Sequence, residues 1–132
     1  MTGQKKNSMS TPLRSVRGLG SARDGTGHFW RIRVSSVALL PLSLFVVGWI
    51  LSLDGAGYVA VRASLASPFV AMMVLAFLLV SLDHMRLGMQ VIIEDYVHGE
   101  GMKLALLMLN LFFCVALAAI CVFAILKIAF GG

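Results

Sequence analysis

Three stretches of the chain contain no charged residue, and each is long enough to cross a lipid bilayer as a helix. They run from Val34 to Leu53, from Ala63 to Leu82 and from Leu104 to Leu126. A helix rises about 1.5 Å per residue and the hydrocarbon layer is about 30 Å thick, so about 20 apolar residues suffice. Unpaired backbone groups are too costly in lipid, and the strands of a membrane barrel would alternate apolar and polar residues. The pattern predicts an all-α membrane protein with three transmembrane helices.

Positive charge is concentrated ahead of the first apolar stretch. This placement argues against nucleic acid as the partner of the basic residues. It agrees with the positive-inside rule, under which Lys and Arg stay on the cytoplasmic side of the membrane. We therefore expect a cytoplasmic N-terminus and, after three crossings, a C-terminus on the outer side. Seven of the 11 Lys and Arg belong to this group, opposed only by Asp24: Lys5, Lys6, Arg14, Arg17, Arg23, Arg31 and Arg33.

The chain is expected to divide into a tail and a membrane domain. Residues 1–28 have few large apolar side chains, so they cannot bury a core and we expect a cytoplasmic tail. Ser67 and Pro68 form a start signal for the second helix, with Ser as N-cap and Pro in the first helical position. The early first span favours a bacterial rather than an organellar protein. The membrane domain then covers residues 29–132, with spans at about 31–53, 67–93 and 103–128.

Most of the polar chemistry lies on the second span and its inner end, between Asp83 and His98. At about 100° per residue, His84, Gly88 and Asp95 fall on one stripe of that helix. A glycine one turn from a histidine leaves room for a flat group such as a porphyrin bound by the imidazole. The same spacing also fits a close helix–helix contact with a hydrogen-bonded histidine, so the residues alone leave both interpretations open.

Two other pairs of side chains also have a structural interpretation beside a functional one. Asp83 and Arg86 are three residues apart, and we expect them to pair and reduce the cost of two charges in lipid. Asp95 and Tyr96 lie about 16 Å from His84 along the axis, near the membrane surface. A phenol and a carboxylate there would suit the two-electron, two-proton reduction of a quinone, but the residues alone favour an interfacial tyrosine beside solvated acids, because such belts are common. Gln90 is expected to bond to a neighbouring helix.

The remaining candidate ligands are given plain structural roles. Cys114 and Cys121 are seven residues apart on one helix, too far for a disulfide, and are expected to be packing residues. Two cysteines cannot hold an iron–sulfur cluster, which takes four thiolates. His28 and His98 are expected to be exposed to solvent. The sequence therefore predicts no flavin or iron–sulfur centre of its own.

The row from Asp83 to His98 resembles the hydrophobic membrane anchor subunit of succinate dehydrogenase. That family carries His, Gly four residues on, and Asp-Tyr at eleven and twelve, which fall here on His84, Gly88, Asp95 and Tyr96. Alphaproteobacterial members are most similar, and the segment around Phe29 to Arg33 and the three-span plan also match.

The resemblance implies an electron-transfer subunit of respiratory complex II in a bacterial inner membrane. His84 would be an axial ligand of haem b beside Gly88, Arg33 would contact a haem propionate, and Tyr96 with Asp95 would form part of the ubiquinone site. The second axial histidine would come from a second anchor subunit of the cytochrome b556 type. A flavoprotein subunit and an iron–sulfur subunit would deliver electrons from succinate.

Two other function classes remain as alternatives. A small transporter or proton channel would use His84 and Asp95 as a relay, but it predicts ionisable residues on the other spans, which have almost none. A purely structural membrane subunit without haem is the second alternative, and the crowding of polar residues on one helix argues against it.

Overall fold

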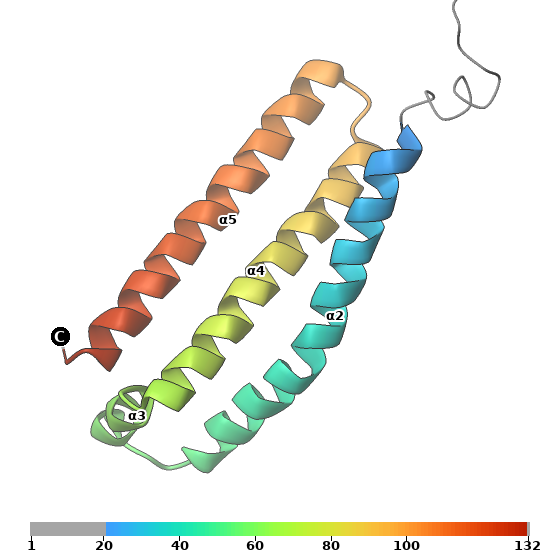
Figure 1. Cartoon of the computed structure of the whole chain (residues 1–132). Coiled ribbons are helices and arrows are strands. Elements are labelled where there is room, and N and C mark those ends of the chain that lie inside the picture. Colours follow the sequence, from blue (N-terminus) through green and yellow to red (C-terminus); the bar gives the residue numbers. More distant parts are fainter. Residues whose placement is uncertain (1–20, 132) are drawn as a thin grey trace, which may run out of the picture. The chain divides into compact units, whose positions relative to one another are not determined.

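The computed structural model describes residues 21–131, which form three long helices and one short one. Within these residues there is no strand, and three helices are long and apolar enough to cross a membrane. The predicted all-α class with three membrane spans is thus confirmed. The helices are α2 (Ser21–Ser52), α3 (Tyr58–Leu65), α4 (Pro68–Tyr96) and α5 (Glu100–Ala129) (Figure 1).

The chain separates into two compact units, Met1–Arg31 and Ile32–Gly132, and the packing of helices described here concerns the second. In that unit α4 lies between α2 and α5 (Figure 1). The rings of Phe45 on α2 and Phe69 on α4 meet edge to face with centroids 5.7 Å apart, an arrangement that aromatic pairs favour. The two helices are thus held together near the start of α4.

A polar contact joins α4 to α5 in the middle of the apolar spans. The Asn110 side-chain amide on α5 donates a hydrogen bond to the backbone carbonyl of Arg86 on α4, at 3.0 Å. An asparagine that enters lipid must find a partner, and a carbonyl on the next helix is a common solution. Asn110 therefore fixes the register of these two helices.

The helix boundaries agree with the sequence signals in part. Ser67 is the N-cap of α4 and Pro68 its first residue, although the Ser67 hydroxyl makes no capping bond. Helix α2 continues through Pro41, as expected of a proline in a membrane helix. It begins at Ser21, inside the stretch assigned to the tail, and α3 lies between the first two predicted spans, where the sequence analysis places no helix.

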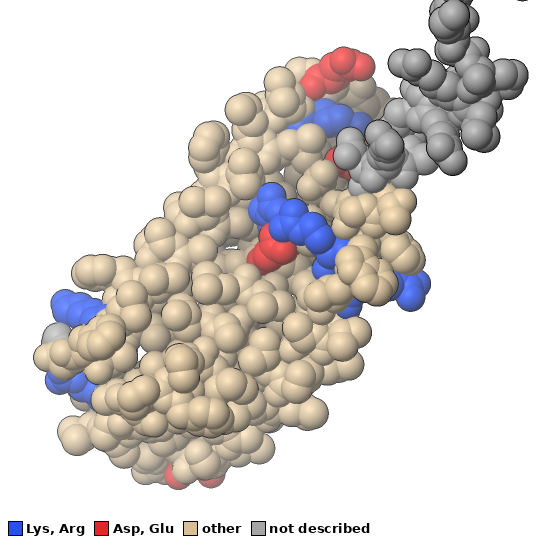
Figure 2. Space-filling model, in the orientation of Figure 1, with Lys and Arg blue, Asp and Glu red and all other residues tan. Residues whose placement is uncertain are grey.

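Few side chains of the described residues are buried inside this single chain. Uncharged side chains cover most of the length of α4 and α5 in Figure 2. Such a surface suits lipid tails or another membrane subunit, since neither penalises apolar exposure. The buried apolar residues are Val46, Ala71, Leu87, Ile93, Cys114 and Ile125.

Leu87, which is only 2% exposed, should be the most sensitive packing position on α4. We expect Leu87→Ala to lower the free energy of unfolding by about 2 kcal/mol, through the cavity alone, because lipid is as apolar as leucine. The measurement is the thermal unfolding of the detergent-solubilised protein, followed by its helical circular dichroism. Leu104→Ala, at a position 61% exposed, is the matched control and should change little. Equal effects at both positions would contradict the assignment.

Candidate functional site

Helix α4 is unbroken from Pro68 to Tyr96, so the polar residues on it lie at fixed heights. His84 falls within the apolar span, and Tyr96 is the last helical residue. Asp95 lies about 16 Å from His84 along the axis, as the sequence predicted for a continuous helix. The helix thus carries an imidazole at membrane depth and an acid beside a phenol at its end.

His84 is half-buried and is held by a contact from α2. Its Nδ1 lies 2.9 Å from the hydroxyl oxygen of Ser35, which is itself buried. Among the described residues, its other ring nitrogen, Nε2, has no hydrogen-bond partner. One nitrogen is therefore fixed and the other is available to a ligand.

The surroundings of His84 fit one axial ligand of a haem. Gly88, one turn along α4, is exposed, and a Cβ placed on it would meet no heavy atom within 4 Å. A flat group bound to the imidazole could therefore approach the helix backbone at Gly88. In the described range, no three His, Cys, Asp or Glu side chains gather as a metal site, so this chain offers the imidazole as a single ligand.

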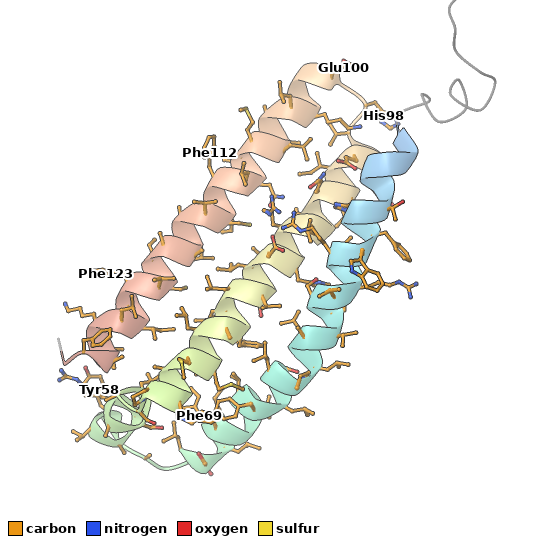
Figure 3. All side chains as sticks on the ribbon, in the orientation of Figure 1. Tyr58, Phe69, His98, Glu100, Phe112 and Phe123 are labelled. Atoms are coloured by element: carbon orange, nitrogen blue, oxygen red, sulfur yellow. The ribbon has the colours of Figure 1, made fainter. Side chains whose placement is uncertain are left out.

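Asp95 and Tyr96 occupy the last turn of α4, and both are exposed. Tyr96 is 78% exposed, and no side chain described within residues 26–131 forms a hydrogen bond with its hydroxyl or with the Asp95 carboxylate. A phenol that can donate a hydrogen bond and a carboxylate that can accept a proton are therefore both exposed at this end of the helix. The labelled His98 and Glu100 mark this same end of the molecule in Figure 3.

Arg33 is exposed on α2, the helix that also carries the Ser35 contact to His84. Arg33 precedes Ser35 by two residues on α2, so its side chain leaves that helix about 200° away from the serine that contacts His84. Its height along α2 is nevertheless close to that of Ser35. The structure therefore places Arg33 at the depth of the imidazole but on another face.

Asp83 and Arg86 form the predicted ion pair. The Arg86 Nη2 lies 3.0 Å from an oxygen of Asp83, and the pair borders a hollow of about 240 Å³ between α4 and α5. The prediction for Gln90 was wrong, because its amide donates to Glu94 on the same helix at 2.8 Å. Side chains four residues apart on a helix are neighbours, so Glu94 lies within reach of the Gln90 amide.

Predictions for the other candidate ligands are confirmed except at His28. Cys114 is buried, Cys121 is partly buried, and both are free thiols. His98 is exposed in the connection between α4 and α5. His28, expected to be exposed, is half-buried, so that prediction was wrong.

Sequence reasoning missed Ser35. Its partner His84 is 49 positions away, and no local pattern indicates which of several serines on an apolar helix will face a histidine. The contact of Asn110 could be anticipated, because it is the single amide in the third apolar stretch and such a residue bonds to a neighbouring helix.

Comparison with known proteins gives a consistent family. Residues 7–125 match the model of the succinate dehydrogenase/fumarate reductase transmembrane subunit. The succinate dehydrogenase hydrophobic membrane anchor subunit of Paracoccus denitrificans is 31% identical over 121 residues, which cover 92% of this chain and 93% of that protein. The subunit of the same name from Rickettsia conorii is 29% identical over 97 residues, covering 73% and 77%. No solved structure matches significantly.

Proposed function

Because the chain belongs to the family of succinate dehydrogenase and fumarate reductase transmembrane subunits, we propose that it binds haem b and helps to reduce quinone. As a membrane anchor subunit it belongs to a complex with other subunits of the dehydrogenase. The observation that carries the proposal is the unbroken helix α4, which bears His84 at membrane depth and Asp95 with Tyr96 at its end.

His84 would hold the haem iron on one side, and Gly88 would leave room for the ring. When bound, the haem supplies a one-electron carrier within the membrane. His84 is the one histidine on α4, so a second anchor subunit would supply another histidine for the same haem. Arg33, which is exposed on α2, would hold a haem propionate.

Tyr96 and Asp95 would act on the quinone itself. The phenol hydroxyl of Tyr96 donates a hydrogen bond to a quinone carbonyl oxygen, which favours the negative charge that develops as electrons arrive. The Asp95 carboxylate passes protons from water, so that two electrons and two protons convert quinone to quinol. The electrons originate at flavoprotein and iron–sulfur subunits, and ubiquinone is the quinone we propose.

The orientation follows from charge. Arg31 and Arg33 flank the start of the apolar part of α2, and five further basic residues precede them. By the positive-inside rule the N-terminus is cytoplasmic, which places Asp95 and Tyr96 on the cytoplasmic side of a bacterial inner membrane. A dehydrogenase docked there would stand next to the quinone site.

Purification of the tagged chain from its own membranes in mild detergent tests this proposal. We expect a b-type haem band in the reduced-minus-oxidised spectrum, together with a flavoprotein, an iron–sulfur protein and a second membrane subunit. Protein staining and flavin fluorescence identify the partners. Absence of both the haem band and the flavoprotein would defeat the proposal.

A further inference from the structure

We infer that Ser35 is a positioning residue for His84, which it holds in the one neutral tautomer whose Nε2 lone pair can bind iron. The inference rests on the proposed haem function and deepens it, since it names the group that orients the ligand. It depends on hydrogen-bond geometry between α2 and α4, in the unit that begins at Ile32.

The direction of the Ser35–His84 hydrogen bond follows from the number of hydrogens available. Ser35 carries a single hydroxyl hydrogen, and it donates that hydrogen to the carbonyl of Ile32 at 2.9 Å. With that hydrogen on the Ile32 carbonyl, the Ser35 oxygen has only lone pairs to offer the His84 Nδ1 atom, also 2.9 Å away, so we assign Nδ1 as the donor. Ser35 is 8% exposed, so water has little access to replace either bond.

The tautomer follows from that direction. A neutral imidazole has one N–H group, and here it must be on Nδ1, which leaves a lone pair on Nε2. Nε2 has no hydrogen-bond partner in the part of the chain that is described. Histidines that bind metals commonly donate their other N–H to an acceptor, which fixes the ring and makes the ligand nitrogen more basic.

Ser36 provides an internal comparison. Its hydroxyl donates to the same Ile32 carbonyl at 2.8 Å, but the residue is exposed and forms no hydrogen bond with His84. Ser35 and Ser36 thus share the local helix bond and differ in the contact with the histidine. Any effect of losing the backbone bond alone should appear equally at both positions.

The test uses the whole complex in membranes, with Ser35→Ala, Ser35→Thr and Ser36→Ala in this chain. The measured quantities are haem per complex, the low-spin spectrum and the haem midpoint potential. We expect Ser35→Ala to weaken haem retention about tenfold and to raise the midpoint potential, because a less basic ligand stabilises ferric iron less. Ser35→Thr, which keeps the hydroxyl, and Ser36→Ala should match the wild type.

The other possible results of this experiment also test the role of Ser35. If Ser35→Ala does not assemble, Ser35→Cys keeps the size while its sulfur is a weak acceptor, and it should show the same rise in potential. An unchanged potential in Ser35→Ala, an equal change in Ser36→Ala, or failure of both the Ala and Cys variants to assemble would overturn the inference. In those cases the wild-type haem band leaves the proposed function standing, whereas a wild-type complex without b-type haem would overturn both.

Discussion

Complexes that carry His84→Ala should lose the low-spin spectrum of a six-coordinate b-type haem. His84 is the one histidine on α4, and its imidazole is the side chain that we propose as the haem ligand. We expect haem per complex to fall by more than about tenfold. Loss of the ligand itself should have a larger effect than loss of a residue that only forms a hydrogen bond with the ligand. Absorbance and electron paramagnetic resonance of purified membranes measure the change.

His98→Ala is the matched control for this variant. It also removes an imidazole from the neighbourhood of α4, but His98 is exposed in the connection to α5 and forms no hydrogen bond with His84. Its haem spectrum should equal that of the wild type. A normal low-spin spectrum in His84→Ala, with the complex assembled, would remove His84 from the haem site.

Tyr96→Phe should slow quinone reduction by about a hundredfold and leave succinate oxidation by a soluble artificial acceptor unchanged. The substitution removes one hydroxyl from an exposed side chain, so the fold has little to lose. The quinone carbonyl, however, would lose the hydrogen bond that favours its reduction, an effect of the size usual for a positioned acid or base. Parallel assays with a water-soluble quinone and with the artificial acceptor separate the two steps.

Tyr58→Phe provides a control of the same chemistry at the other end of the molecule. Tyr58 begins α3 and is 78% exposed, the same fraction as Tyr96, and Figure 3 places it near the start of α4. Both activities should remain normal in this variant. If Tyr96→Phe lowered both activities together, the role assigned to the Tyr96 hydroxyl would be wrong.

Local sequence signals predicted much of α4. Ser67 and Pro68 define where it starts because their backbone preferences act at the boundary itself, and the ion pair of Asp83 with Arg86 depends only on a three-residue spacing. Its end was placed about three residues too early, since helix termini have weak signals. Short-range patterns thus account for the helix and for the order of groups along it.

Other features depend on which helices meet, and the sequence could not supply them. The Ser35 contact with His84 needs α2 beside α4, and nothing near Ser35 distinguishes it from Ser36. The error at Gln90 has the same origin, because the choice between Glu94 and another helix depends on distances that spacing does not give. Helix α3 was missed because a short helix has little hydrophobic periodicity to detect.

The polar contacts along α4 also differ in when they can form during synthesis. An Asp or Arg near the centre of an inserting helix costs about 3 kcal/mol. Asp83 and Arg86 can offset that cost as soon as α4 coils, because their ion pair lies within one helix. The bond of Ser35 to His84 can form only when α2 packs against α4. The bond of Asn110 to the Arg86 carbonyl can form only when α5 does so. Helix α4 can thus enter the bilayer with Asp83 and Arg86 paired, while its imidazole acquires a fixed orientation only once α2 packs beside it.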